Sequence, residues 1–481
     1  MTKERACYSS RWRCVPCRRP RRRAATCRAA LVAVASALIA LVIMRSPVVQ
    51  AGTGPSPFDL RPTTVSGWPG EAPDDAPTLF LPAGFTATVF ARLPAPEVRT
   101  LAVSPTGLLY ATNPKYGAVV ALPAADGDGH ADAVVDVLTG LDCPYGLAFD
   151  GDWLYVAQRH QVIRYPLAFP SAAAPRSPSP PPVDGMNATG GVAAAPLPAV
   201  GLPAAAPAPA VVPAVAGPGE VIVDGLPEAV CGPHGFRPLA LDPAHDALYV
   251  ALGSSCNVCV ESGPGASQRA KVWRYPLHLP GPGEVVARGL RNVPALALNP
   301  WDGRLWAVGD ERDDLGDDVP PDLVTALVPG ADYGWPACYL NAAGRWQVDR
   351  RVPPSNPACT GLAVPDLFVP AHTTPLGLAF HDGRGLPAAF GPSLFVALHG
   401  SWNHSVGVGY KVVRVPLDAQ GQPAGLPQEF ALGWLPRASH RAPDEAWGRP
   451  VNVAVGPDGA LYVSDDKADL IYRITYTPAA P

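Results

Sequence analysis

FRPLALDPAHDALYVALG, residues 236–253, contains two short apolar runs separated by a polar turn. Runs of this length, bounded by Pro, Asp and Gly, predict two short strands joined by a turn. A related phrase occurs six times, and most copies are followed by a third apolar run such as VIRYPL or VWRYPL. The copies begin at Val98, Pro144, Phe236, Val293, Pro375 and Pro450. The chain is therefore predicted to be all-β and built from repeated units of a few strands.

Six such units predict a six-bladed β-propeller. A single small sheet cannot bury both of its faces, so repeated sheets stack against one another and close into a ring. The ring leaves a central channel on which the loops between blades converge. We therefore expect the functional residues of this chain on those loops.

The composition favours this fold and excludes one class of partner. The 481 residues include 61 prolines and 47 glycines, which leaves little capacity for long helices. The formal net charge is only −4, so electrostatics give no reason to expect nucleic acid as a partner. The sequence also lacks the Gly-x-Gly-x-x-Gly fingerprint of a dinucleotide-binding strand, turn and helix.

The first 51 residues have the three parts of an export signal. Arginines crowd the segment before an apolar run from Ala29 to Met44, and small residues end the segment at Ala51. The run is shorter than an ordinary membrane span. We interpret residues 1–51 as a signal peptide, with an uncleaved membrane anchor as the alternative. Either interpretation predicts a secreted or periplasmic protein, or one on the extracellular face of the membrane.

Three further segments are predicted downstream. Residues 52–80 form a Pro-rich lead-in, and residues 81–478 form the propeller. Residues 169–218 interrupt the second blade with a stretch made almost entirely of Ala, Pro, Val and Gly. Because such a stretch lacks the large apolar side chains of a packed core, we interpret it as a disordered insertion.

The six cysteines beyond the signal predict disulfides, because exported proteins meet an oxidising environment. The Cys-x-x-Cys pair at 256–259 lacks the following His of a covalent haem site and a second ligand pair for zinc. We therefore interpret it as a local disulfide. The predicted bridges are Cys256 with Cys259, Cys338 with Cys359, and Cys143 with Cys231.

The sequence DGDGHAD, residues 126–132, places oxygen-bearing side chains at alternate positions. Asp126, Asp128 and Asp132, with glycines that let the loop wrap a hard cation, suit a surface Ca²⁺ site. A polar turn between two outer strands explains the same pattern, and the sequence does not choose between them. Neither interpretation is catalytic.

The sequence GPHGFRPLAL, residues 232–241, suggests chemistry more directly. His234 and Arg237 lie immediately before the first buried strand of the third repeat, on the channel side of the predicted propeller. An imidazole there could act as a general base, beside a guanidinium that holds an anion. The structural alternative is a hydrogen-bonded turn histidine.

Several motifs follow one another over most of the predicted propeller. The most specific are SSCNVC at 254–259, DYGWP at 332–336 and HGSWN at 399–403. From about residue 81 to residue 475 the chain resembles the L-sorbosone dehydrogenase-like family of quinoprotein sugar dehydrogenases, relatives of soluble glucose dehydrogenase. The resemblance implies a six-bladed propeller that binds pyrroloquinoline quinone (PQQ) with a Ca²⁺ ion at the channel mouth. It also implies oxidation of a sugar or polyol hydroxyl, or of an aldehyde hydrate.

The resemblance assigns roles to individual residues. His234 matches the family's catalytic histidine, and the backbone carbonyls of Glu311 and Arg312 match its Ca²⁺ ligands. Such an enzyme needs an external electron acceptor, a cytochrome or a membrane quinone, because this chain has no haem motif. The candidates for binding the cofactor or orienting the substrate are Arg237, Arg291, Asn292, His372, Asn403 and Arg449.

Several positions depart from the family pattern, including Asp310-Glu311-Arg312-Asp313 where the family usually has Asn-Gly-Arg-Asp. Tyr145 replaces a His, Leu323 replaces a Glu, and His404 replaces an Arg after HGSWN. These departures favour the main alternative, a non-catalytic propeller that binds a glycan or a protein through its channel face. A Ca²⁺-dependent hydrolase of the lactonase type is a third hypothesis, although the aligned loops supply few channel carboxylates.

Overall fold

The structure is a computed structural model and describes residues 56–69, 76–168, 212–352 and 359–478. Almost all regular structure in these ranges is β-strand, and the helical content is one 3₁₀ turn, η2 (Pro243–His245). No helix of the described ranges is long and apolar enough to span a membrane. The predicted signal at 1–51 lies outside the described residues, as does most of the predicted insertion.

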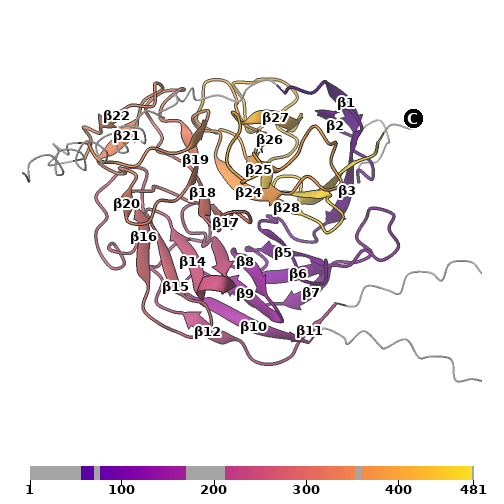
Figure 1. Cartoon of the computed structure of the whole chain (residues 1–481), viewed down its shortest axis with the longest axis horizontal. Helices are drawn as coiled ribbons and strands as arrows, with labels where there is room; N and C mark the ends of the chain where they lie inside the picture. The colour runs from indigo at the N-terminus through magenta and orange to yellow at the C-terminus, as the bar shows by residue number, and fades with distance from the viewer. Residues whose placement is uncertain (1–55, 70–75, 169–211, 353–358, 479–481) are drawn as a thin grey trace, which may run out of the picture. The chain divides into compact units, whose positions relative to one another are not determined.

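Six sheets of at least four strands form the blades, which can be followed by their labels in Figure 1. The inner strands are β4 (Leu101–Val103), β8 (Leu147–Asp150), β13 (Leu239–Asp242), β17 (Ala295–Leu298), β24 (Pro375–His381) and β28 (Pro450–Val455). The second strands are β5 (Leu109–Asn113), β9 (Trp153–Ala157), β14 (Ala247–Leu252), β18 (Leu305–Gly309), β25 (Ser393–Leu398) and β29 (Leu461–Asp465). We number the blades 1 to 6 in this order.

The outer half of each blade contains two more strands. The third strands are β6 (Ala118–Leu122), β10 (Val162–Ala168), β15 (Lys271–Pro276), β19 (Asp322–Ala326), β26 (Lys411–Pro416) and β30 (Leu470–Tyr476). The fourth strands are β7 (Val135–Leu138), β12 (Glu220–Val223), β16 (Glu284–Arg288), β23 (Leu367–Val369), β27 (Gln428–Leu432) and β3 (Phe85–Arg92). The strand pairings within each blade are antiparallel.

Alternation of side chains explains why the blades stack. In β25, Leu394, Val396 and Leu398 pack against blade 4, whereas Phe395 and Ala397 pack against blade 6. Successive side chains of a strand point to opposite faces of its sheet, so an apolar strand supplies two interfaces at once. The six hydrophobic clusters of the described core each join two neighbouring blades. The apolar core is therefore divided among the interfaces between blades.

The ring closes through the first and last parts of the described chain. Each inner strand contacts the inner strand of the next blade, from β4 through β28 and back to β4. Blade 6 takes its fourth strand, β3, from residues that precede blade 1, and Phe85–Arg92 pair with Leu470–Tyr476. The predicted six-bladed β-propeller is confirmed. Pairing of β3 with β30 therefore joins the first and last parts of the ring through strand hydrogen bonds.

The remaining strands extend the blades at their edges. β1 (Leu60–Thr64) and β2 (Thr78–Pro82) lengthen blade 5, and β20 (Ala331–Asp332) runs parallel to β16. β21 (Cys338–Leu340) and β22 (Trp346–Val348) form a separate hairpin. β11 (Ala214–Val215) pairs with β10, so residues placed near the end of the predicted insertion belong to blade 2.

Candidate functional site

One end of the propeller collects most of the residues singled out in the sequence. Because the strands of a blade alternate in direction, each inner strand begins at the end where the second strand finishes. We call this end the loop face. His234, Arg291 and Arg449 precede inner strands, and Glu311 and Asn403 follow second strands, so all lie at the loop face.

His234 lies in the loop between β12 and β13, with a left-handed backbone of φ 62°. Its Nδ1 atom lies 2.9 Å from Oγ of Ser254 and 3.2 Å from the Ser254 carbonyl. Its Nε2 atom has no hydrogen-bond partner among the described residues. Burial, with the positive charge of Arg291 nearby, lowers the pKa of His234 to about 4. The ring is therefore neutral at pH 7, with one nitrogen held and the other open.

The His234 ring lines a pocket of about 420 Å³ between blades 2 and 3. Arg159, Glu228 and Arg269 also line this pocket. Arg159 is paired with Asp142 at 3.0 Å, and Arg269 donates to the carbonyl of Glu228. The pocket wall therefore contains the His234 imidazole beside two arginines that already have partners within the protein.

Arg237 has its described partners within the loop that carries His234. Its guanidinium donates to the carbonyls of His234, Phe236 and Pro227, the last at 2.7 Å. The residue is 1% exposed. Sequence analysis predicted a cofactor contact for Arg237, whereas the contacts in the structure are those of a residue that shapes the loop.

Arg291 connects blade 3 to the loop after β18. Its Nη1 atom donates to the Asp310 carboxylate at 3.0 Å and to the carbonyl of Glu311 at 2.8 Å. Its Nη2 atom donates to the Asp313 carboxylate at 2.7 Å. The backbone carbonyl of Asn292 accepts from the Asp310 N–H at 3.0 Å. Arg291 thus bonds to the carboxylates of Asp310 and Asp313 and to the Glu311 carbonyl, one of the two carbonyls predicted to bind Ca²⁺.

Asn403 and His372 meet on the other side of this loop. The Asn403 amide donates to the Asp313 carboxylate at 2.5 Å and lies 3.3 Å from Nδ1 of His372. Nε2 of His372 lies 2.8 Å from the carbonyl of Gly316. Both ring nitrogens of His372 therefore have protein partners. Asp313 brings Arg291, Asn403 and His372 together, although sequence analysis did not single it out.

Acidic groups under this loop carry strong electrostatic effects. Burial raises the pKa of Glu311 to about 7, and the Asp310 carboxylate adds to the effect. Burial also raises the pKa of Asp322 well above its ordinary value. Asp322 accepts from the backbone N–H groups of Glu311 and Thr374, both at 2.9 Å. Arg312 is bonded to the buried Asp349 carboxylate, which fixes the far side of the loop.

A second polar group, missed by sequence analysis, lies where blades 1, 5 and 6 meet. Nε2 of His399 is 2.9 Å from Asp466 Oδ1, and Nη2 of Arg99 is 2.9 Å from Asp466 Oδ2. Arg449 donates to the backbone carbonyls of His399 and Gly400. Arg449 was a predicted cofactor contact and His399 begins the HGSWN motif, whereas Arg99 and Asp466 gave no signal other than their position beside an inner or second strand at the loop face.

Tyr145, one of the departures from the family pattern, is buried immediately before the inner strand of blade 2. Its ring stacks on Phe236 with centroids 4.3 Å apart, and the Arg99 guanidinium lies 4.9 Å from the Phe236 centroid. Its hydroxyl donates to the carbonyl of Pro294 at 3.1 Å, across from blade 2 to blade 4. A small pocket of about 100 Å³ between the inner strands is also lined by Tyr145. Tyr145 therefore ties three blades together.

The departures at Leu323 and His404 have different surroundings. Leu323 is buried in the interface between blades 3 and 4, where a Glu side chain would lack a charged partner in the same apolar cluster. His404 lies edge-on to His372, with ring centroids 6.3 Å apart, and its Nδ1 accepts from the Val406 N–H. Leu323 thus belongs to the core, and His404 to the loop face.

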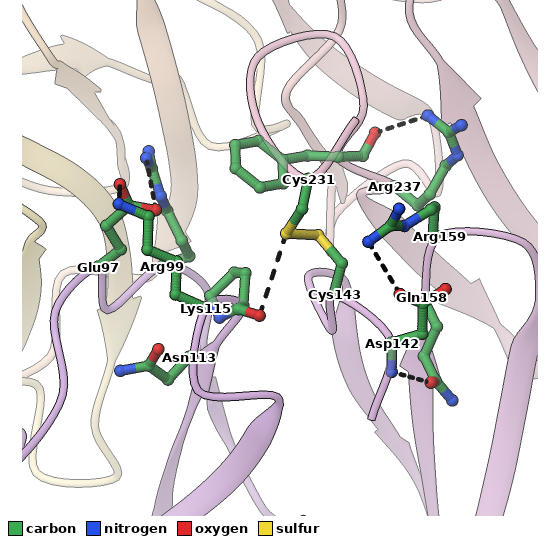
Figure 2. Close-up of a disulfide and its surroundings, with 12 residues drawn as sticks. Glu97, Arg99, Asn113, Lys115, Asp142, Cys143, Gln158, Arg159, Cys231 and Arg237 are labelled. Carbon is green, nitrogen blue, oxygen red and sulfur yellow. Dashed lines mark hydrogen bonds and ion pairs between the residues drawn. A yellow bond between two sulfur atoms is a disulfide. The ribbon is translucent and has the colours of Figure 1, made fainter. Parts of the chain in front are cut away.

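All three predicted disulfides are confirmed. Figure 2 shows the Cys143–Cys231 bond, which joins the segment before β8 to the loop that carries His234. Beside it, the Asp142 N–H donates to Gln158 and the Asp142 carboxylate pairs with Arg159. The bond therefore fixes the His234 loop to blade 2 at one end, while Ser254 holds it to blade 3 at the other.

The acidic loop at 126–132 lies away from the loop face, between the third and fourth strands of blade 1. Asp126 and Asp128 accept from backbone N–H groups two residues ahead, and Asp132 accepts from the Ala125 N–H. These are the contacts of a polar turn. Within the part of the chain that the structure describes, three His, Cys, Asp or Glu side chains come close enough to share a metal ion only at Cys256, Cys259 and Glu261, where both cysteines are in a disulfide.

Comparison with known proteins places this geometry in a family. A family model described as TrAA12-like matches residues 210–477, more than half of the chain. The chain belongs to the TrAA12-like family. The specific L-sorbosone dehydrogenase subtype implied by the motifs stays a prediction.

Two curated relatives of this TrAA12-like protein are similar over part of their length. An uncharacterised protein of Borreliella burgdorferi is 28% identical over 253 residues, 52% of this chain and 63% of that protein. A pyrroloquinoline quinone-dependent pyranose dehydrogenase of Coprinopsis cinerea is 29% identical over 232 residues, 40% of this chain and 31% of the enzyme. The chain thus spans less than two thirds of either relative.

Solved structures agree on the fold. The calcium structure of a Trichoderma reesei AA12 enzyme has a TM-score of 0.63 at 18% identity, covering 83% of this chain and 98% of that one. The holo PQQ domain of Coprinopsis cinerea pyranose dehydrogenase has a TM-score of 0.61 at 18% identity, covering 83% and 97%. At this identity the likeness establishes the propeller architecture.

Proposed function

We propose that this TrAA12-like protein is an exported, PQQ-dependent dehydrogenase that oxidises a hydroxyl or aldehyde hydrate of a sugar or polyol. The observation that carries the proposal is His234, whose Nδ1 is held by Ser254 while its Nε2 is open at the loop face. The Coprinopsis relative, named as a PQQ-dependent pyranose dehydrogenase, supports the same reaction class.

The donors at the loop face suit an anionic, oxygen-rich cofactor such as PQQ. Arg99, Arg291 and Arg449 precede the inner strands of blades 1, 4 and 6 at this end of the ring. The Nε atoms of Arg99 and Arg291 are buried without a hydrogen-bond partner among the described residues. Guanidinium groups bind carboxylates through two parallel hydrogen bonds. Arg291 and Arg449 would therefore hold the cofactor, with Asn292 and Asn403 beside them.

The loop after β18 suits a Ca²⁺ ion. Hard cations prefer carboxylate and carbonyl oxygens, and this loop presents Asp310 and Asp313 with the predicted carbonyl ligands of Glu311 and Arg312. Arg291 occupies part of this environment, since it donates to the carbonyl of Glu311. We propose that Ca²⁺ joins Arg291 in balancing the carboxylates when the cofactor binds.

His234 would take the proton from the substrate hydroxyl. The Ser254 hydroxyl donates to the carbonyl of Cys256 at 2.7 Å, so its oxygen is left to accept from Nδ1–H of His234. This arrangement leaves the lone pair on Nε2, the atom that can receive a proton. The bound quinone would supply the hydride acceptor. Ser254 is thus a positioning residue that fixes the tautomer.

The finer parts of the proposal concern substrate, acceptor and location. The sorbosone-like substrate follows from the motif resemblance, and an external cytochrome or quinone acceptor follows from the absence of a haem motif in the sequence. Export, with a tether as the alternative, follows from residues 1–51.

The test is a titration of the purified protein with PQQ and Ca²⁺, followed by dye reduction with aldoses, polyols and sorbosone. We expect saturable quinone binding by the wild type and by His234→Gln, with turnover lost only in the variant. Ser254→Ala should lower the reduction rate about tenfold, equivalent to about 1.4 kcal/mol, with quinone affinity unchanged. His245→Gln is the matched control, because His245 is an exposed histidine bonded to Asp242 at the opposite end of blade 3.

Absence of quinone binding would contradict the proposal and favour a glycan- or protein-binding propeller. Tyr145 is the structural feature that favours this second function, since it replaces the family's His with a ring that stacks on Phe236 and a hydroxyl that bonds to blade 4. Full turnover in His234→Gln would instead be consistent with a dehydrogenase but would show that His234 is not its base.

A further inference from the structure

His399 is a buried histidine outside the predicted site residues. Within the described chain three histidines are buried, His372, His381 and His399. His381 bonds the carbonyl of Gly459 and the N–H of Gly383, and His372 likewise has a partner on each ring nitrogen. His399 has a partner on Nε2 alone in the described structure. A purely structural role does not account for the open nitrogen.

Asp466 sets the proton position on His399. A carboxylate only accepts, so the 2.9 Å contact with Asp466 requires the proton on Nε2 and leaves the lone pair on Nδ1. The Arg99 guanidinium and the hydrogen bond from His399 lower the pKa of Asp466 despite its burial, so the carboxylate stays ionised. Arg99 bonds the second carboxylate oxygen at 2.9 Å and fixes its orientation.

The three side chains form a rigid unit at the loop face. His399, Asp466 and Arg99 come from blades 5, 6 and 1 and are each 9 to 10% exposed. The other charged group that faces His399 is Arg449, which donates to its backbone carbonyl. Tyr145 also lies close to the charges of Arg99 and Asp466.

Contacts extend from this unit toward the His234 site on two sides. On one side, Arg99 lies over Phe236, two residues from His234. On the other side, the His399 N–H donates to the carbonyl of Thr374, two residues from His372, whose neighbours Asn403 and Asp313 lead to Arg291. His234 and His399 therefore lie on loops of the same face of the propeller, with the Arg99–Phe236 and His372–Asn403–Asp313 contacts between them.

We propose that Nδ1 of His399, held by Asp466 and Arg99, is a second proton acceptor of this site and serves a different proton from that taken by His234. This inference rests on the proposed function. Oxidation of a sugar hydroxyl removes two electrons and two protons, and an external one-electron acceptor must collect the electrons in two steps. Reoxidation of a bound quinone cofactor by such an acceptor would release one proton with each electron, and each proton must leave the site.

His399 would accept one of these protons and pass it to water. His234 would serve the reductive half of the cycle and His399 the oxidative half. Asp466 and Arg99 are positioning residues in this scheme, because they act through the orientation and tautomer of His399.

The first test uses the apo-protein. In ¹⁵N-histidine-labelled wild type, the His399 signal is identified by its loss in His399→Gln, and we expect the tautomer with the proton on Nε2. Asp466→Asn should change the tautomer or its exchange. A wild-type signal with the proton on Nδ1 would overturn the proposal. The measurement needs neither cofactor nor turnover.

The second test separates the half-reactions by stopped flow after loading with PQQ and Ca²⁺. We expect His399→Gln to slow reoxidation by a one-electron dye at least tenfold while reduction by the sugar changes less than twofold. Asp466→Asn should act in the same direction, and His245→Gln should change neither rate. Normal quinone binding with unchanged reoxidation in both variants would overturn this inference alone. A wild type that binds no quinone would overturn the proposed function and this inference with it.

Discussion

Removal of the Cys143–Cys231 disulfide tests how the chain is held around its site. The two cysteines are 88 residues apart, the longest separation of the three bridges. The chain-entropy relation predicts that the bond stabilises the native state by about 4.6 kcal/mol at this separation. For the bridges at separations of 21 and 3 residues the same relation gives about 3.3 and about 1.6 kcal/mol. Total stabilities of 5 to 15 kcal/mol are usual, so each difference is measurable.

The assay is urea unfolding of paired Cys→Ser variants under non-reducing conditions, followed by tryptophan fluorescence. We expect Cys143→Ser/Cys231→Ser to lose the most stability, then the 338–359 pair, then the 256–259 pair. The native site should survive, because Ser254 and Arg237 still hold the His234 loop. Equal losses in the three variants, or a larger loss for the 338–359 pair, would refute the reasoning from loop closure.

The remaining predictions concern buried charge. Burial lowers the pKa values of His234 and His399 from 6.5 to about 4, so the unfolded chain binds more protons between these values and stability falls as pH decreases through that range. Each histidine accounts for a loss of at most about 3 kcal/mol of unfolding free energy as the pH falls through this range. The slope of unfolding free energy against pH should therefore flatten when both histidines are replaced by Gln. Asp322→Asn should cost about 1 to 3 kcal/mol, because the Asn amide cannot accept from both backbone N–H groups. The exposed Asp302→Asn control should cost less than about 1 kcal/mol in the same urea assay.

Much of the fold could be read from the sequence, because local pattern determines it. The phrase at 236–253 becomes β13 and β14, and its copies become the inner and second strands of every blade. Blade 6 differs from this pattern in its fourth strand, because β3 comes from residues before the first repeat. Ring closure depends on contacts between the ends of the described chain, which a local pattern does not encode.

The candidate site was predicted less completely. The motif resemblance pointed to His234 and to the loop after β18, and the structure brings both to the loop face. Sequence analysis missed Asp313, which connects Arg291 to Asn403, and Ser254 as the partner of His234. These residues bond side chains from different blades, and such contacts have no spacing along the chain. Arg237 shows the opposite case, since its position in a motif did not reveal that its partners are carbonyls of its own loop.

The sequence by itself determined the all-β class and the number of blades, because strand alternation and turn residues are local properties. The short spacing of Cys256 and Cys259 likewise indicated their bridge, whereas the Cys143–Cys231 bond joins residues 88 apart that only the fold brings together. Only the tertiary structure decided which polar atoms are satisfied. Two buried histidines have both nitrogens bonded, whereas His399 keeps one open beside Asp466. That difference arises because six blades bring their loops to one point, where burial and neighbouring charge, rather than residue type, determine what each side chain can do.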